Sequence, residues 1–378
     1  MLRSLAPAVV LALTVLLFAL PASASPTQGS PASFIVVLEP SVSRAAPVAR
    51  EHAKRFGATI THVYEHALKG YAGIFPEARL AALRADERVA YIEPDALVTV
   101  SAQTLPWGID KVDADVSSTL AGNGSGTVST VNVYVIDTGV DTRHADLNVV
   151  RHVNFAGGQN RDCHGHGTHV AGTIAARDNT SDVVGVAPGA PITGVKVLGC
   201  NGSGSTSGVI MGVDWVRANA IKPAIANMSL GGSASTALDN AVKAAADSGI
   251  FFAVAAGNSG ADACNYSPAR AGTYSGVMTV AATDSADREA SWSNYGACVD
   301  LWAPGVSILS TRRGGGTTTM SGTSMASPHV GGGGALYLSG NSGASPGSVE
   351  SALRRAATTA GTTSKDGRTI IRLDVSGF

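Results

Sequence analysis

Short apolar runs alternate with helical stretches from Trp107 to the end of this 378-residue chain. The runs are apolar on both faces, which is typical of parallel strands that helices cover on each side. Helical patterns between successive strands favour parallel pairing, because parallel strands need a long crossover connection. The sequence therefore predicts an α/β fold with a parallel sheet and helices on both faces. The expected strands are Val131–Ile136, Ile192–Leu198, Ile225–Met228, Ile250–Ala255 and Val277–Ala281, and the expected helices are Gly167–Ala176, Val209–Asn219 and Ala237–Ser248.

The N-terminal segment is typical of a secretory signal. Arg3 supplies a positive charge, Leu5–Leu20 is apolar, and Ala22-Ser23-Ala24 has the A-x-A form of a cleavage site. The apolar run falls short of the roughly 20 residues that a membrane span needs. We therefore expect residues 1–24 to be a signal peptide, and the remaining chain to be secreted and extracellular, without a membrane anchor.

Residues 25–100 are predicted to form a separate small unit. Its pattern from Phe34 to Ile92 is strand, helix, strand, strand, helix, strand, which is a ferredoxin-like α+β order. An extended tail, Glu93–Val100, follows, in which Pro94 prevents a helix. The small polar residues Ser101–Thr104 then join this tail to residues 101–378. This organisation suggests a pro-segment whose tail lies in an active site until the join is cut.

The composition narrows the classes of partner. Charged residues make up 15% of the chain and the formal net charge is -1, so we expect no nucleic-acid partner. Four cysteines in an exported chain favour two disulfides over a metal site. Three pairings of these cysteines are possible from the sequence alone. Nothing in the sequence indicates more than a monomer.

Three polar motifs stand in glycine-rich settings along the larger segment. Asp137 directly follows the first predicted strand, His166 opens a helical run, and Ser324 opens another. In doubly wound sheets, functional side chains gather beyond the carboxyl ends of the strands. A neutral imidazole there can take a proton from a serine while a carboxylate fixes the imidazole tautomer. Read singly, Ser324 would be an ordinary helix cap.

A second donor for an oxyanion is also available. The backbone N–H of Ser324 lies at a predicted helix start, where the helix dipole favours negative charge. Asn258 follows the strand Ile250–Ala255 and could supply a side-chain donor beside it. The Gly-Asn-Ser-Gly sequence around Asn258 is by itself typical of a surface turn.

Other hydrolases that use these residue types fit less well. An aspartic protease needs a second Asp-Thr/Ser-Gly besides the one at Asp137, and the chain has none. An α/β-hydrolase needs an acid and then a histidine after the serine. Only His329 follows Ser324, with no acid between them. The order Asp, His, Ser is that of subtilisin.

A zinc hydrolase is the second hypothesis. His164, His166 and His169 have the H-x-H-x-x-H spacing of metallo-β-lactamase-like hydrolases. Those proteins carry Asp just before the third histidine, where this chain has Thr168. The more distant ligands would have to come from His144, His152 or His329. A third hypothesis is a catalytically inactive binding relative of a protease.

Together, the three motifs resemble those of the subtilases, the subtilisin-like serine proteases, and most closely the proteinase K and aqualysin branch. The matching stretches are Val135–Val140, His166–Thr173 and Gly322–Val330, and the similarity begins near Phe34. The resemblance implies a secreted serine endopeptidase that acts through an acyl-enzyme on Ser324. It implies the triad Asp137, His166 and Ser324, with Asn258 as the oxyanion donor.

The resemblance also assigns a role to the small N-terminal unit. Residues 25–100 resemble the inhibitor-like propeptide of the family, which helps the protease to fold and inhibits it until self-cleavage. The resemblance implies a cut between Val100 and Gln103. Residues 101–378 would then be the subtilisin-like peptidase domain.

The resemblance places polypeptide substrates between two glycine-rich segments. An extended peptide would pair with both segments by strand addition. Because the walls of the first pocket are small and neutral, we expect broad cleavage after apolar or aromatic residues. The segments are Gly202, Ser203, Gly204 and Ser229, Leu230, Gly231, and the pocket walls add Ala255, Ala256 and Gly257.

Disulfides and a structural Ca²⁺ are further implications of the resemblance. The implied pairs are Cys163–Cys200 and Cys264–Cys298. The implied calcium ligands are Asp300 and the backbone carbonyls of Val277 and of a residue near Ser275, which are hard oxygen donors.

Two features depart from the family pattern. His164 stands where the branch often has Asn. Gly331–Gly334 lie within a predicted buried helix, where each glycine costs roughly 1 kcal/mol relative to alanine. Either a locally looser helix or a very close neighbour would account for these glycines.

Overall fold

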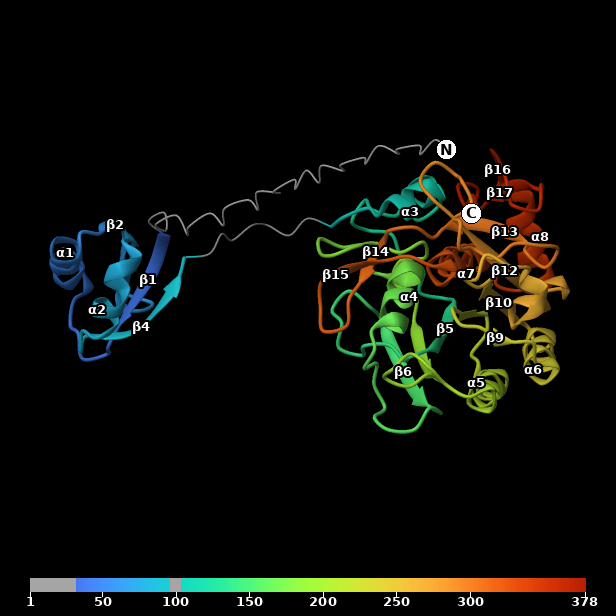
Figure 1. Cartoon of the computed structure of the whole chain (residues 1–378), viewed down its shortest axis with the longest axis horizontal. Helices are drawn as coiled ribbons and strands as arrows, with labels where there is room; N and C mark the ends of the chain where they lie inside the picture. The colour runs from blue at the N-terminus through green and yellow to red at the C-terminus, as the bar shows by residue number, and fades with distance from the viewer. Residues whose placement is uncertain (1–31, 96–102) are drawn as a thin grey trace, which may run out of the picture. The chain divides into compact units, whose positions relative to one another are not determined.

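The chain divides into two compact units, Met1–Thr99 and Val100–Phe378. The computed structural model describes residues 32–95 and 103–378, which Figure 1 draws as ribbons. The expected signal peptide and most of the expected cleavage region lie outside the described residues. Across the part of the chain that is described, no helix has the length and apolar character needed to span a membrane.

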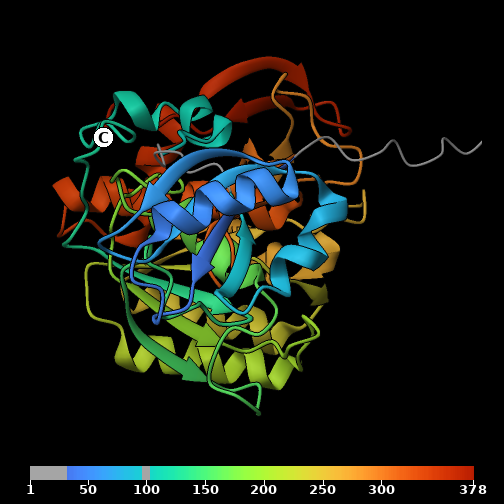
Figure 2. The ribbon, with the colours of Figure 1, turned by 90° about the vertical axis from the view of Figure 1, so that its left-hand side faces the viewer.

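The first unit is an antiparallel sheet in the order β2-β3-β1-β4 with two helices on one face (Figure 2). Val36, Tyr71, Phe75 and Leu83 are buried between the sheet and the helices. The order of elements confirms the predicted ferredoxin-like pattern. The elements are β1 Ala32–Leu38, α1 Ala45–Phe56, β2 Thr59–Tyr64, β3 Gly70–Phe75, α2 Leu80–Arg84 and β4 Val89–Pro94.

The second unit contains a nine-stranded sheet in the order β16-β17-β13-β12-β10-β8-β5-β7-β6. The pairs that join β6 through β17 are all parallel. The strands are β5 Asn132–Asp137, β6 Val149–Asn154, β7 Ile192–Lys196, β8 Ala224–Met228, β10 Ile250–Ala255, β12 Val277–Thr283, β13 Leu301–Pro304, β16 Thr358–Thr363 and β17 Thr369–Arg372.

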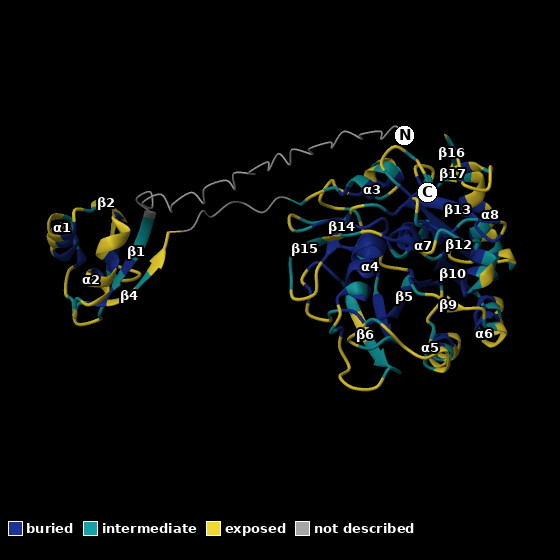
Figure 3. Ribbon diagram, viewed as in Figure 1, coloured by how far each residue is buried: buried dark blue, intermediate teal, exposed yellow. Residues whose placement is uncertain are grey.

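Helices cover both faces of this sheet, as the sequence predicts. On one face, α4, α7 and α8 contribute to a large apolar core, and on the other, α5 and α6 enclose a second core. Figure 3 shows the central strands and α7 as buried, with exposed residues along the outer sides of α5 and α6. The helices are α4 His166–Ala175, α5 Thr206–Asn219, α6 Thr236–Asp247, α7 Thr323–Gly340 and α8 Pro346–Ala356.

The five predicted strands lie at the centre of the sheet, and the strands missing from the prediction lie toward its edges. β16 is Thr-Thr-Ala-Gly-Thr-Thr, in which intermediate and exposed positions alternate, and it runs antiparallel to β17. It carries no apolar run to detect because it is an edge strand. The prediction of a parallel sheet therefore holds for the core and is wrong for this edge.

Close neighbours explain two of the glycines of α7, Gly332 and Gly334. A Cβ on Gly332 would lie 2.6 Å from the Cβ of Val186, and one on Gly334 would lie 2.7 Å from the ring of Phe251. Both distances are too short for carbon atoms in contact. Phe251 belongs to β10, against which α7 packs, so Gly334 lets this helix approach the sheet closely. Gly332 lets it approach the loop that carries Val186.

Candidate active site

Asp137 and His166 meet at the carboxyl end of the sheet. Asp137 is the last residue of β5 and is fully buried, and His166 is the first residue of α4. The imidazole Nδ1 lies 2.8 Å from Asp137 Oδ1, which also accepts the N–H of Thr138 at 2.7 Å. An ionised carboxylate only accepts hydrogen bonds, so Nδ1 carries the proton and Nε2 has the free lone pair.

The electrostatics of this pair favour a basic imidazole. Burial alone would lower the pKa of His166, but the charge of Asp137 and the hydrogen bond to it outweigh burial and raise that pKa. A higher pKa makes Nε2 a better proton acceptor while leaving it neutral in alkaline solution. The Asp137–His166 pair can therefore act as a general base.

Ser324 lies in the first turn of α7. Its hydroxyl donates to the backbone carbonyl of Ser229 at 3.1 Å, and the hydroxyl of Ser229 donates to the carbonyl of Ser324 at 2.7 Å. No hydrogen bond joins His166 to Ser324 within residues 103–378. The structure thus pairs Asp137 with His166 and ties Ser324 to the segment that follows β8.

Asn258 is held in one orientation by Thr323, a residue that the sequence analysis did not identify. Asn258 Oδ1 accepts both the N–H and the hydroxyl of Thr323 at 2.9 Å. The Thr323 hydroxyl in turn accepts the N–H of Gly257 at 3.0 Å. With Oδ1 engaged, the amide Nδ2 of Asn258 is the group left to donate beside Ser324. The only sequence signal for Thr323 is its place directly before the serine.

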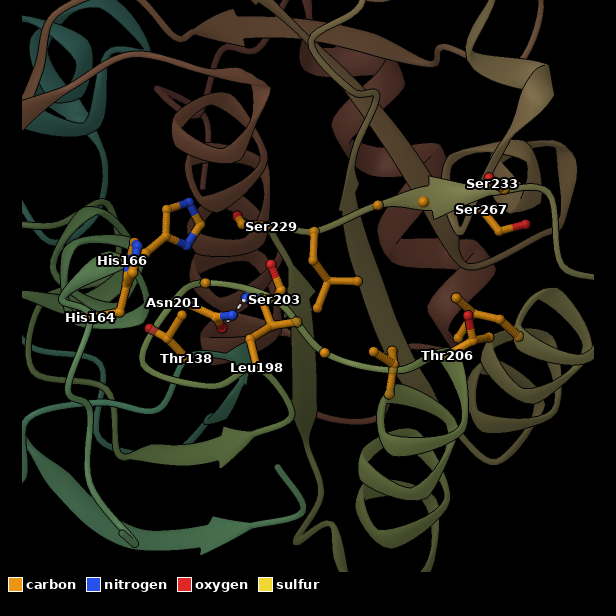
Figure 4. A pocket seen from close by; sticks show the side chains of 17 residues that line it. Thr138, His164, His166, Leu198, Asn201, Ser203, Thr206, Ser229, Ser233 and Ser267 are labelled. Carbon is orange, nitrogen blue, oxygen red and sulfur yellow. Dashed lines mark hydrogen bonds between the residues drawn. The ribbon is translucent and has the colours of Figure 1, made fainter. Parts of the chain in front are cut away.

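Two cavities share one wall, formed by residues 230–233. The larger, of about 460 Å³, is lined by His166, Ser203 and Gly204, and the smaller, of about 260 Å³, by Ser324 and Asn258. Figure 4 shows His164 and His166 at one end of the larger cavity and Ser233 and Ser267 at the other. The two glycine-rich segments named from the sequence therefore both line the larger cavity.

The smaller cavity contains the residues expected for the first pocket except Ser229, which lines the larger cavity. Ala255, Ala256 and Gly257 line it together with Leu230 and Gly231. None of the lining residues carries a charge. Asn294 fixes this wall, because its Nδ2 donates to the carbonyl of Ala256 and its Oδ1 accepts the N–H groups of Ser259 and Ala261.

Asp162 organises the turn before α4 and was also missed. It is buried, and its Oδ1 accepts the N–H groups of His164 and Gly165 at 3.0 and 2.8 Å. Its Oδ2 accepts the hydroxyl of Thr168 at 2.5 Å. An acidic residue just before a helix start is a recognisable signal, since a carboxylate is stabilised there.

The three histidines of the H-x-H-x-x-H pattern do not form one metal site. His169 is fully buried, and its Nε2 donates to the carbonyl of Ile308 at 3.0 Å. Burial lowers the pKa of His169 to about 4. Within the described ranges, no group of three or more His, Cys, Asp or Glu side chains is placed to hold a metal. The zinc-hydrolase hypothesis is therefore wrong for this arrangement.

The four cysteines form two disulfides. Cys163 bonds to Cys200, and Cys264 bonds to Cys298. These are the pairs that the resemblance implies. Cys163, in the first pair, lies three residues before His166. The chain-entropy estimate assigns about 3–4 kcal/mol to loops of this length.

The donors expected for calcium fit a hard cation in their chemistry. Burial raises the pKa of Asp300 to about 7, although the charge of Arg354 opposes this rise. Asp300 Oδ1 accepts a hydrogen bond from Arg354, and Oδ2 accepts the N–H of Thr279 at 2.5 Å. The carbonyl of Thr279 accepts the N–H of Asp300, so the carbonyl of Val277, two residues earlier in β12, points to the same side. The half-exposed side chain of Arg354 is the group that a cation would displace.

Comparisons with known proteins agree with the geometry. Residues 129–369 match the subtilase family, and residues 33–101 match peptidase inhibitor I9. The chain is 48% identical to an extracellular serine proteinase of Thermus sp. over 79% of this chain and 73% of that protein. It is 47% identical to alkaline serine exoprotease A of Vibrio alginolyticus, over 79% of this chain and 57% of that protein.

Solved structures give the same result. A cold-adapted subtilisin-like serine proteinase aligns with a TM-score of 0.63 and 44% identity, and the alignment covers 72% of this chain and 98% of that one. The family match covers more than half of the chain, and it includes Asp137, His166 and Ser324. The chain therefore belongs to the subtilase family of serine proteases and carries an N-terminal I9 inhibitor domain.

Proposed function

We propose that this protein is a secreted serine endopeptidase that hydrolyses polypeptides through an acyl-enzyme on Ser324. The observation that carries the proposal is the Asp137–His166 pair at a cavity that shares a wall with the cavity of Ser324, where Thr323 holds Asn258 in one orientation. The extracellular character of the Thermus relative supports secretion.

The first step is the attack of Ser324 on a peptide carbonyl. The serine hydroxyl leaves the Ser229 carbonyl and turns to Nε2 of His166, which takes its proton as the oxygen–carbon bond forms. Asp137 stabilises the imidazolium that results. His166 then gives this proton to the leaving amine as the peptide bond breaks, which leaves an ester on Ser324.

Water then hydrolyses the acyl-enzyme, with His166 acting first as base and then as acid. His166 takes a proton from water, the hydroxide oxygen bonds to the acyl carbon, and the serine oxygen leaves with a proton from His166. In both steps the carbonyl oxygen gains negative charge. The Nδ2 of Asn258 and the N–H of Ser324 would donate to this oxygen, and one such donor is worth roughly 3–4 kcal/mol of barrier.

The larger cavity supports binding of an extended peptide. Gly202–Gly204 and Ser229–Gly231 line it, and Gly204 and Gly231 are exposed to solvent. The uncharged smaller cavity supports cleavage after apolar or aromatic residues. A buried basic side chain would find no carboxylate partner among its lining residues.

The I9 domain supports synthesis as a zymogen with its own propeptide as inhibitor and folding helper. Gln103 is already part of the second unit, because its Nε2 donates to the carbonyls of Arg177 and Val183 at 2.7 and 3.2 Å. The N–H of Thr104 donates to the carbonyl of Asp182. These contacts favour self-cleavage on the N-terminal side of Gln103.

Calcium would act in this enzyme as a structural ion. Asp300 and the carbonyls of Val277 and Ser275 would hold it at the start of β12, and the ion would neutralise the buried carboxylate. No step of the reaction uses it.

A fluorophosphonate probe tests the proposed function. We expect the wild-type protein to be labelled at Ser324 and to digest casein, and Ser324→Ala to do neither, with a loss of turnover on the order of 10⁶-fold. Circular dichroism controls for folding of the variant. Equal labelling of the two proteins would refute the proposal.

A further inference from the structure

The catalytic histidine has a second imidazole beside it. The rings of His164 and His166 have centroids 6.2 Å apart and are inclined by 66°. Both line the larger cavity, and Figure 4 shows them at the same end of it, next to the loop that carries Asn201 and Ser203. His169, the third histidine of the H-x-H-x-x-H pattern, is fully buried and does not line this cavity.

We propose that His164 and His166 form a two-histidine site for Zn²⁺ or Cu²⁺, and that the bound ion reversibly inhibits the enzyme. Imidazole nitrogen suits these ions. The binding claim stands on the two side chains alone, while the inhibition rests on the proposed function of His166.

His166 is already arranged as a metal ligand. Its Nδ1 donates to Asp137, which leaves the lone pair of Nε2 for an ion. A carboxylate on the far nitrogen of a histidine fixes the ring and raises its basicity as a ligand, as in carboxylate–histidine–zinc sites. The Ser324 hydroxyl is bonded to Ser229, so it does not occupy Nε2.

His164 has the freedom that the second ligand needs. Its side chain is exposed, and its ring makes no hydrogen bond to the described residues. Asp162 fixes its backbone, since Oδ1 accepts the N–H of His164 and that of the next residue. The main chain is therefore set while the imidazole can rotate.

The ring separation is close to that of a chelate. Zn–N bonds of about 2.0–2.1 Å at a tetrahedral angle place two imidazole centroids about 5 Å apart. The observed 6.2 Å needs a closure of about 1 Å, which rotation of the exposed His164 side chain can supply. Water or the Ser324 hydroxyl would complete the coordination. An ion on Nε2 removes the lone pair that accepts the serine proton.

The test compares His164→Asn with His164→Asp in the secreted, processed protein. Asparagine lacks a good zinc ligand, whereas aspartate of the same size offers one. Zinc binding is measured by isothermal titration calorimetry in a buffer that does not chelate zinc. Inhibition of peptide hydrolysis is measured in the same buffer, relative to the zinc-free rate of each variant.

We expect one zinc per wild-type chain and an inhibition midpoint that agrees with the calorimetric Kd. His164→Asn should weaken both by at least roughly tenfold, the lower end of the loss seen even for outer-shell partners of a metal. His164→Asp should restore part of the loss. Equal zinc affinity in wild type and His164→Asn would overturn the proposal. So would the absence of binding by the wild-type protein at about 1 mM ZnCl₂, since a weaker Kd would not be specific binding. His164-dependent binding to a protein without protease activity would instead refute the proposed function and leave the zinc site standing.

Discussion

At the scale of single residues, the chemistry depends on two restrained side chains. Asp137 fixes the proton of His166 on Nδ1, and Thr323 fixes the amide of Asn258. The hydrogen bond at His166 Nδ1 leaves Nε2 free to accept a proton, and the hydrogen bonds at Asn258 Oδ1 leave Nδ2 free to donate. The restraints place a proton acceptor at one cavity and a hydrogen-bond donor at the cavity that shares a wall with it.

The raised pKa of His166 predicts the acid limb of the pH profile. The base must be neutral, so kcat/KM should fall as the pH drops through this pKa, and the midpoint should lie above the ordinary histidine value of about 6.5. This midpoint is measured by steady-state kinetics on a peptide substrate between about pH 5 and 10. That range covers the ordinary pKa values of His and Tyr.

Asp137→Asn is the matched variant for this profile. It removes the two largest causes that raise the pKa of His166, the charge of Asp137 and the hydrogen bond to its carboxylate, so the acid limb should move to lower pH. The rate at neutral pH should fall on the order of 10⁴-fold, because the imidazole tautomer is no longer fixed. A wild-type midpoint below 6.5, or an unmoved limb in Asp137→Asn, would contradict the assignment.

At the scale of elements, α7 carries Ser324, the proposed nucleophile, and packs against the sheet. Its glycines differ in what surrounds them. A Cβ on Gly332 would meet Val186 at 2.6 Å, whereas one on Gly331 would meet nothing closer than 3.5 Å. Glycine is therefore required sterically at the first position and only tolerated at the second.

Gly332→Ala and Gly331→Ala should change stability in opposite directions. The first forces Val186 away, and overpacking of this kind costs about 1–3 kcal/mol. The second should stabilise by up to about 1 kcal/mol, because alanine favours the helix. Urea unfolding of fluorophosphonate-inhibited protein measures both free energies. If the two variants were equally stable, close packing would not be the reason for the glycines.

At the scale of the whole molecule, stability depends on a buried carboxylate that links the sheet to α8. Burial raises the pKa of Asp300 to about 7, above the ordinary aspartate value of about 3.9. The protonated form thus favours the folded state. Its contribution is full below the unfolded pKa and is lost as the pH rises through 7.

Calcium should reverse this loss. In chelator, the Tm of the inhibited mature protein should decrease between roughly pH 5 and 8, with Asp300 contributing to the decrease. Adding Ca²⁺ at pH 8 should raise the Tm, and Mg²⁺, which demands a tighter octahedral site, should do so less. Asp300→Asn should reduce both the decrease and the calcium effect. A calcium response that survives unchanged in Asp300→Asn would place the ion elsewhere.

The sequence by itself determined the elements and the chemical groups. Buried parallel strands such as Ile250–Ala255 are apolar throughout, so β10 is predicted with the bounds that the structure has. Asp137, His166 and Ser324 are recognisable because strand ends and helix starts gather at one edge of such a sheet. The polar edge strand β16 gives no such signal.

Only the tertiary structure decided which groups meet. The sequence presents three histidines at H-x-H-x-x-H, and the fold turns His169 into the core while His164 and His166 share a cavity. Thr323, Asp162 and Arg354 act through contacts with residues distant in the chain or through turn geometry. Local patterns fix secondary structure because they reflect burial along one element, whereas side-chain partnership depends on how separate elements pack.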